Sequence, residues 1–326
     1  MKGLATVFGG SGFVGSQIVR GLARRGWRVR VAVRRPALAY RLPMLGDVGQ
    51  IEIVQANVRD DASVVRALDG AEACVNCVAV LHETRGQTFE ALHVEGAGRI
   101  AGAARAAGAA RFAHISAIGA DSESRAAYAR TKAAGEDAVR AGFPGSAILR
   151  PSVVFGPGDA FFNRFAAMAA LAPALPLIGG GQTRFQPVFV GDVAAAVAAA
   201  LTDPAVAGAA YELGGPTVYS FEALMRLMLD VIGRHKPLIP IPFGAARWLG
   251  RIGDLVGRAG LAPPLTADQV EMLKSDNIVT PGAPGLAELG VAATAVEVII
   301  PTYLTRYRKG GQYAEAIQAA LAAPAP

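Results

Sequence analysis

The chain has 326 residues, of which 52% are hydrophobic and 18% are charged. This composition excludes disorder of the chain as a whole, and the length favours one large domain with a smaller appended lobe. No apolar run is long enough to span a bilayer. The basic residues behind the formal net charge of +6 are scattered, which favours a basic surface around a nucleotide site over nucleic-acid binding.

A glycine-rich segment joins the first predicted strand, residues 4–8, to a helix that includes residues 17–24. Between a strand and a helix, the spacing G-x-x-G-x-x-G provides a tight turn, close approach to a pyrophosphate and close helix packing. The first amides of the helix also attract phosphate. The residues expected to form this dinucleotide site are Gly9, Ser11, Gly12, Phe13, Val14 and Gly15. The alternative is a tight turn that binds no ligand.

The second predicted strand, residues 27–33, is followed by two arginines and by no acidic residue. An acidic residue here binds the free 2′-hydroxyl of NAD, whereas an arginine accommodates the 2′-phosphate of NADP. Arg34, with Arg35 as the second candidate, therefore predicts NADP(H) as the cofactor. A solvated arginine pair is the alternative.

Further strands are predicted over residues 51–54, 73–80 and 111–116, with helices over residues 64–68 and 89–107. Strands that alternate with helices at this spacing predict a doubly wound parallel sheet. The turn after the third strand and the end of the fourth are expected to contact the cofactor through Asn57, Val58, Ala79 and Val80.

The cysteines and histidines predict neither a disulfide nor a metal site. Cys74 and Cys77 fall in one predicted strand, where their Cα atoms are about 10 Å apart, beyond the roughly 4.4–6.8 Å of a disulfide. They are therefore expected in the core. The histidines are isolated from one another, at His82, His93, His114 and His235.

Three residues have the chemistry of a reductase site. Ser116 ends a predicted strand at the edge where ligands bind, and Tyr128 and Lys132 share one face of the next helix. A nearby ammonium is expected to lower the pKa of the Tyr128 phenol from about 10, which suits a proton donor to a carbonyl oxygen held by Ser116. Lys132 can also bind the nicotinamide ribose, so the pair has a use without turnover.

The glycine turn, Ser116, the Y-x-x-x-K pair and the segment 150–157 together resemble the extended or atypical short-chain dehydrogenase/reductase superfamily. In that family the R-P-x-x-x-x-G-P segment follows the sixth strand and wraps the nicotinamide end. The resemblance covers the chain to about residue 215. It implies further cofactor contacts from Pro151 and Val154.

We therefore expect a Rossmann-type doubly wound parallel sheet with a smaller C-terminal α/β lobe. The NADP(H)-binding domain is expected over residues 1–156, with returning segments at about 186–215. The lobe and a docking tail are expected over residues 157–185 and 216–326.

The second half is similar to one atypical branch, the nucleotide-binding accessory subunits of respiratory complex I (subunit nine of the alpha subcomplex) and their bacterial relatives. The similar segments are residues 158–165, 186–193, 273–279 and 300–308. Members of this branch keep a tightly held NADPH and are regarded as structural. The resemblance thus implies a structural NADP(H)-binding subunit, without turnover of its own, whose partners are other complex I subunits and the membrane surface.

Two departures from the wider superfamily also count against conventional catalysis. They are Asn57, where an aspartate is common, and His93, where an asparagine is usual.

The first strand begins near residue 4, which leaves no room for a transit peptide. We therefore expect a bacterial protein, peripheral on the cytoplasmic face of the inner membrane. The alternatives are a soluble NADP-dependent reductase, dehydrogenase or epimerase acting on a carbonyl or sugar-nucleotide substrate, or a nucleotide-sensing regulator.

Residues 245–258 predict an amphipathic helix. One stripe is apolar, with Ala245, Trp248, Leu249, Ile252, Leu255 and Val256, and the opposite stripe has Arg247, Arg251, Asp254 and Arg258. This pattern is typical of a helix that docks on a membrane or a partner, and a lobe helix packed on its own core is the alternative. Its three glycines each cost about 1 kcal/mol against alanine, so the helix is expected to need a partner surface to be stable. Residues 303–313 are expected to dock beside it.

Overall fold

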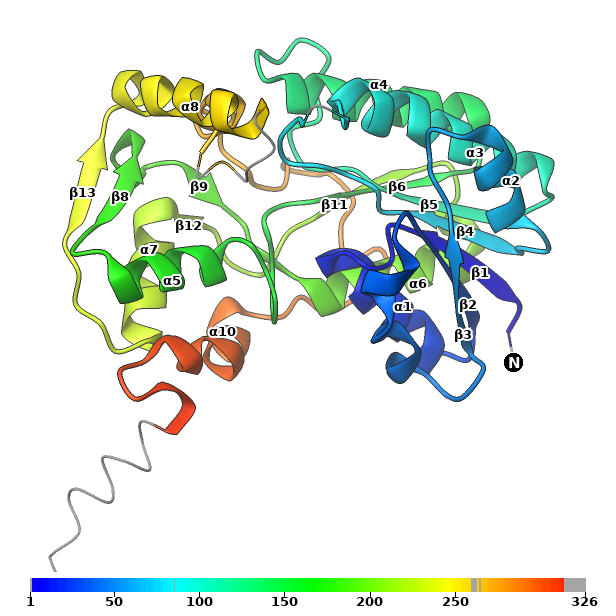
Figure 1. Ribbon diagram of the computed structural model, residues 1–326, viewed down its shortest axis with the longest axis horizontal. Coiled ribbons are helices and arrows are strands. Elements are labelled where there is room, and N and C mark those ends of the chain that lie inside the picture. The colour runs from blue at the N-terminus through cyan, green and yellow to red at the C-terminus, as the bar shows by residue number, and fades with distance from the viewer. Residues whose placement is uncertain (1, 85, 259–262, 264, 314–326) are drawn as a thin grey trace, which may run out of the picture.

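The computed structural model describes residues 2–84, 86–258, 263 and 265–313. Its centre is a sheet of seven parallel strands in the order β11-β6-β5-β4-β1-β2-β3 (Figure 1). The strands are β1 Leu4–Phe8, β2 Arg28–Val33, β3 Ile51–Gln55, β4 Ala73–Asn76, β5 Arg111–Ile115, β6 Ala147–Pro151 and β11 Ala210–Leu213. The order reverses between β1 and β4, where open α/β sheets bind ligands beyond the carboxyl ends of the strands. The predicted doubly wound, Rossmann-type fold is confirmed.

Helices cover both faces of this sheet (Figure 1). α1 and α6 pack together on one face, where Val7, Ile18 and Val197 belong to one buried apolar cluster. α2, α3 and α4 cover the other face, where Phe8 and Ile100 belong to a second cluster. Neighbouring residues of β1 thus enter different clusters, as expected of a strand that is buried on both faces. These helices are α1 Phe13–Arg24, α2 Asp61–Leu68, α3 Gly96–Ala106, α4 Ala127–Gly142 and α6 Val190–Thr202.

A smaller lobe has an apolar cluster of its own, which includes Phe162, Leu175, Met225 and Ile300. Its helices are α5 Phe162–Leu171, α7 Phe221–Val231 and α10 Val296–Leu304. Its short strands pair as β8 Leu175–Ile178 with β13 Leu238–Ile241, and as β9 Arg184–Phe185 with β12 Tyr219–Ser220. A further pair joins β7 Val154–Phe155 to β10 Val188–Phe189. In sequence, these two strands stand where the chain passes from the sheet domain to the lobe and back again. The domain boundaries given above stay a prediction.

The end of the fourth strand and the start of the helix that follows it differ from the prediction. The fourth strand ends at Asn76 and not at residue 80, because the Asn76 side chain accepts the backbone N–H of Val78 at 3.0 Å and turns the chain away. The helix predicted over residues 89–107 begins as a π-helix, Glu90–Glu95, and only then continues as α3. Single π-turns are frequently found at functional sites.

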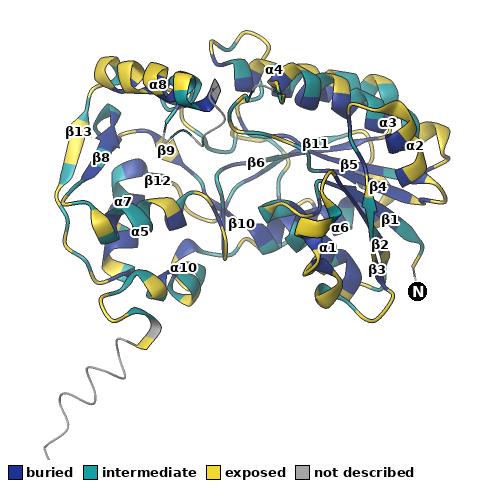
Figure 2. Ribbon diagram, viewed as in Figure 1, coloured by how far each residue is buried: buried dark blue, intermediate teal, exposed yellow. Residues whose placement is uncertain are grey.

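The predicted amphipathic helix is α8, Phe243–Arg258, and its apolar stripe faces outward (Figure 2). Trp248 is 66% exposed and Leu255 is 69% exposed. The buried stripe consists of small residues, Ala246, Gly250, Gly253 and Gly257. It packs on α9, Ala267–Met272, and on the chain just before it. The expectation that the glycines require a partner surface is therefore wrong, because α9 and the chain just before it supply the surface on which they pack.

The predicted docking tail is in part a piece of the lobe. Tyr303 belongs to α10, where its hydroxyl donates a hydrogen bond to the buried carboxylate of Asp159. Residues 314–326 lie outside the described residues. Among the residues that the structure describes, no helix is both long enough and apolar enough to cross a membrane.

Candidate cofactor site

The turn between β1 and α1 has the shape that a pyrophosphate requires. Gly9 has a φ of 77°, which favours glycine, and a Cβ on Gly15 would lie 2.3 Å from the Gly9 carbonyl oxygen. α1 begins at Phe13, and its N-cap residue Gly12 supplies no side-chain hydrogen bond. Ser11 and Gly12 are exposed. The first amides of α1 are therefore open to an anion, and the residues present fit a dinucleotide phosphate.

Arg34 and Arg35 lie at the carboxyl end of β2, beside this turn, because β1 and β2 are neighbours in the sheet. Both side chains are exposed. In the part of the chain that the structure describes, neither guanidinium has an ion pair or a hydrogen bond. The pair thus lies at the carboxyl edge of the sheet with its donors available, and its contact with a 2′-phosphate stays a prediction.

The other predicted cofactor residues lie at the same edge of the sheet. Asn57 and Val58 follow β3, and Ala79 and Val80 are in the loop after β4. The backbone N–H of Asn57 donates to the Ser63 hydroxyl at 2.6 Å, which holds that turn. Pro151 ends β6 and Val154 begins β7. The structure therefore brings all these residues together at one edge, and their cofactor contacts stay a prediction.

Tyr128 and Lys132 share the buried face of α4, as predicted. The Lys132 ammonium donates to the Ile115 carbonyl oxygen at 2.7 Å, at the end of β5. Burial raises the pKa of Tyr128 to about 12. The expectation that Lys132 lowers this pKa is therefore wrong, because desolvation of the phenolate outweighs any help from the ammonium. Burial also lowers the pKa of Lys132 to about 8.

The lowered pKa of Lys132 predicts a pH-dependent affinity for NADPH. Below about pH 8 the side chain is an ammonium, and above it a neutral amine that forms weaker hydrogen bonds with the nicotinamide ribose. NADPH binding should therefore weaken about fivefold between pH 7 and pH 9 in calorimetric titrations. Binding of adenosine 2′,5′-bisphosphate, which lacks that ribose, should change little. An equal pH dependence of both ligands, or one that survives Lys132→Met, would contradict the assignment.

The hydroxyl of Ser116 is already engaged. It donates to Glu136 Oε1 at 2.5 Å, and Arg150 binds the same carboxylate through two hydrogen bonds of 2.8 and 2.6 Å. Burial alone would raise the pKa of Glu136, but the bonds from Arg150 and Ser116 and the charge of Arg140 hold it below its ordinary value. Because Glu136 is ionised, the Ser116 hydroxyl proton is engaged in the hydrogen bond to its carboxylate. This weighs against Ser116 as a hydrogen-bond donor to a substrate oxygen.

His93 is a site residue whose role was missed from the sequence. It lies in the π-helix, and its Nε2 accepts the backbone N–H of Val80 at 3.1 Å. Its Nδ1 therefore carries the proton and lies 3.2 Å from the Thr131 hydroxyl on α4. Its ring stacks on Phe89 and meets Tyr128 edge-on at 5.4 Å. Burial, helped by the Lys132 charge, lowers the pKa of His93 to about 3, so the ring is neutral. Through its two hydrogen bonds this neutral ring connects the loop after β4 to α4.

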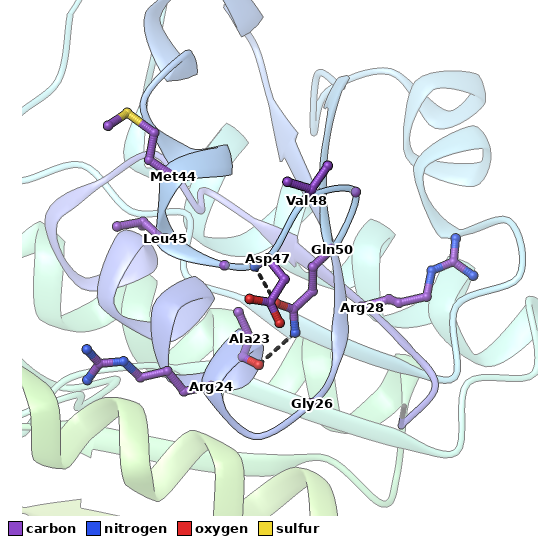
Figure 3. A pocket seen from close by; sticks show the side chains of 11 residues that line it. Ala23, Arg24, Gly26, Arg28, Met44, Leu45, Asp47, Val48 and Gln50 are labelled. Carbon is purple, nitrogen blue, oxygen red and sulfur yellow. Dashed lines mark hydrogen bonds between the residues drawn. The ribbon is translucent and has the colours of Figure 1, made fainter.

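Among the hollows in the described part of the chain, one lies at the amino ends of the strands and another at their carboxyl ends. The first, about 530 Å³ and the larger of the two, is lined by Ala23 and Arg24 in α1, Arg28 at the start of β2 and Gln50 just before β3 (Figure 3). It is therefore away from the cofactor edge. The smaller, about 320 Å³, is lined by residues of the segment 80–87, at the edge where the nicotinamide is expected.

The comparisons agree with this geometry. The family model described as the NAD dependent epimerase/dehydratase family matches residues 5–214. A relative from Arabidopsis thaliana, named NADH dehydrogenase [ubiquinone] 1 alpha subcomplex subunit 9, mitochondrial, is 34% identical over 94% of this chain and 79% of its own length. Another from Caulobacter vibrioides, named ceramide reductase, is 33% identical over 74% of each chain.

A solved structure with the same fold is the NADPH-dependent quinone oxidoreductase QOR2 of Escherichia coli in complex with NADPH. It has a TM-score of 0.70 and 19% identity, over 91% of this chain and 99% of that one. The resemblance drawn from the motifs is thereby confirmed. The chain belongs to the NAD dependent epimerase/dehydratase family, an extended short-chain dehydrogenase/reductase family, and over most of its length it is similar to subunit 9 of the complex I alpha subcomplex.

Proposed function

We propose that this protein is a structural, NADP(H)-binding subunit of respiratory complex I that supports assembly and turns over no substrate of its own. The observation that carries the proposal is the similarity to subunit 9, which extends through the small lobe to 94% of this chain. The engaged hydroxyl of Ser116 supports the absence of turnover, because the proposed reductase site then lacks one of its two donors.

NADP(H) is favoured over NAD(H) by the two arginines after β2. When bound, NADP(H) would supply a hydride donor or acceptor. Here the chain's own groups would hold it: the first amides of α1 the pyrophosphate, Arg34 and Arg35 the 2′-phosphate, and Tyr128 and Lys132 the nicotinamide ribose. These roles explain the Y-x-x-x-K pair without any turnover.

The exposed apolar stripe of α8 supports a peripheral place at the membrane. Trp248, Ile252 and Leu255 form its outer face, and Arg247 and Arg251 are exposed on the same helix. Such a helix lies in the interface plane, with its arginines attracted to anionic headgroups. We therefore propose that the protein docks on the membrane-proximal part of the complex, on the cytoplasmic face of a bacterial inner membrane. Residues 1–156 and 186–215 would form the cofactor domain, and the remainder the docking lobe.

Two single substitutions should separate cofactor binding from chemistry. Tyr128→Phe keeps the ring that contacts His93 and Phe89 and should leave the complex assembled and active in respiration. Gly12→Trp fits the backbone, since φ is −75° and the nearest atom to a Cβ is 3.4 Å away, but its indole fills the phosphate site. The stabilisation lost with the ligand, about 2.7 kcal/mol at a hundredfold excess over Kd, should deplete assembled complex about tenfold or more on native gels. Loss of respiration in an assembled Tyr128→Phe complex would contradict the proposal.

A soluble reductase is the second candidate, favoured by the similarity to ceramide reductase and by the placement of Tyr128 and Lys132 on one buried face. That candidate expects the purified protein to oxidise NADPH with a carbonyl or sugar-nucleotide substrate, and expects Tyr128→Phe to stop it. The structural proposal expects other complex I subunits in a pull-down from native membranes. Identification of the co-purifying proteins therefore decides between the two.

A further inference from the structure

The first turn of α4 is capped by a residue from the far end of the chain. Its own N-cap position, Ala126, offers no side-chain acceptor. The carboxylate of Asp268 on α9 instead accepts the backbone N–H of Ala127 at 2.6 Å and that of Tyr128 at 3.0 Å. A carboxylate at the positive end of a helix is favoured by both hydrogen bonding and the helix dipole. Residues 140 positions apart in sequence thus meet at the helix that carries Tyr128 and Lys132.

The segment around Asp268 also reaches the chain that follows three neighbouring strands. Gln269 Nε2 donates to the Leu81 carbonyl oxygen at 3.4 Å, in the loop after β4. Asn277 Nδ2 donates to the Ile118 carbonyl oxygen at 3.2 Å, after β5. The Asn277 side-chain oxygen accepts from the Ser152 hydroxyl at 2.7 Å, just after β6. One segment of the lobe therefore spans the carboxyl ends of β4, β5 and β6.

We propose that Asp268 is a positioning residue for the nicotinamide half of the cofactor site. By fixing the first-turn amides of α4, it holds Tyr128, and one turn later Lys132, where the nicotinamide ribose is bound. Without the cap, these amides lose their acceptors and the first turn frays. The adenosine half is held by other elements, the α1 turn and Arg34, and does not depend on Asp268. This inference rests on the proposed binding of NADP(H).

α8 determines where Asp268 lies. A Cβ on Gly253 would be 1.8 Å from the Leu265 carbonyl oxygen, and one on Gly250 would be 2.6 Å from the Ala267 amide nitrogen. The two glycines let α9 approach α8 this closely. A substitution at Gly253 must therefore move the chain that enters α9, and Asp268 with it. Gly244, in the same helix, has nothing within 4 Å and serves as its control.

The test compares NADPH with adenosine 2′,5′-bisphosphate, which lacks the nicotinamide half. Asp268→Ala should weaken NADPH binding about five- to thirtyfold, the upper part of the range that loss of a helix cap produces, and leave binding of the bisphosphate within about twofold. It should also reduce the change in dihydronicotinamide fluorescence on binding. Asp268→Asn, which keeps one acceptor oxygen, should lie between. Glu271→Ala removes another α9 carboxylate, one paired with Lys274, and should change neither ligand.

Gly253→Ala should reproduce the selective loss of NADPH, and Gly244→Ala should not. This second pair keeps the test decisive if Asp268→Ala does not fold. Equal loss of both ligands, or unchanged NADPH binding in Asp268→Asn and Gly253→Ala, would overturn the positioning role. If the unaltered protein binds neither NADPH nor the bisphosphate, the proposed cofactor is wrong, and this inference is wrong with it.

Discussion

Replacing Arg34 and Arg35 by alanine should weaken NADPH binding about ten- to a hundredfold and leave NADH nearly unaffected. The two guanidinium groups are exposed at the carboxyl end of β2 and have no ion pair within the described residues. A charge-assisted arginine–phosphate contact contributes about 1.5–3 kcal/mol, which corresponds to that change in Kd. NADH has no 2′-phosphate, so the substitutions remove no contact from its binding. Calorimetric titration of both cofactors measures the ratio directly.

A nearby arginine provides the control for this pair. Arg41 is exposed in the same connection between β2 and β3 and lies 5.4 Å from the ring of Tyr40. Arg41→Ala removes the same charge and should leave both cofactors unchanged. If the Arg34 and Arg35 variant loses NADPH and NADH equally, the arginines shape the site or the surface, and they do not select NADP(H).

The cofactor turn could be predicted from the sequence because its determinants are local. A buried strand, glycines at fixed spacing and an amphipathic helix follow one another within 24 residues, and each has its own physical requirement. The same holds for Tyr128 and Lys132, whose spacing alone places them on one helix face. Their pKa values could not be predicted in this way, because burial depends on what the rest of the chain packs over them.

The contacts that were missed are made across long distances in sequence. Ser116 finds its acceptor 20 residues on, and Asp268 caps a helix 140 residues earlier, with no local pattern to indicate either. The end of β4 depended on one side chain, Asn76, that bonds to the backbone of its own turn. Residue 93 stands out in the sequence only as a departure from the usual asparagine, and the π-helix that gives the histidine its contacts has no sequence signature of its own.

The amphipathic helix α8 illustrates the limit of periodicity. The pattern identified an apolar stripe containing Trp248, but not whether that stripe faces the core or the outside. The answer lies in a second stripe, in which Gly250 and Gly253 leave room for α9 to approach closely. Because glycine has no side chain to mark a face as apolar, that inner face is inconspicuous in the sequence. The structure leaves the bulky apolar stripe exposed, and this predicts that the stripe is the docking face.

Replacing Trp248 and Ile252 by glutamate should release the protein from the membrane fraction while NADPH stays bound. The two side chains are 66% and 47% exposed, so their loss removes little packing from the chain itself. Burying each in an interface contributes about 1.5–3 kcal/mol, so the double change should weaken docking by about a hundredfold or more. Fractionation of cells that express the variant, with NADPH titration of the released protein, measures both effects.

Met44→Glu with Val48→Glu is the matched control for location. It adds the same two charges at apolar side chains that are 82% and 108% exposed, but these lie before β3 at the amino edge of the sheet, beside the larger hollow (Figure 3). This variant should remain with the membrane. If the Trp248 and Ile252 variant also stays there, the exposed stripe of α8 is not the docking face. If it unfolds and loses NADPH, the stripe belongs to the core of the lobe, and the proposed membrane contact is wrong.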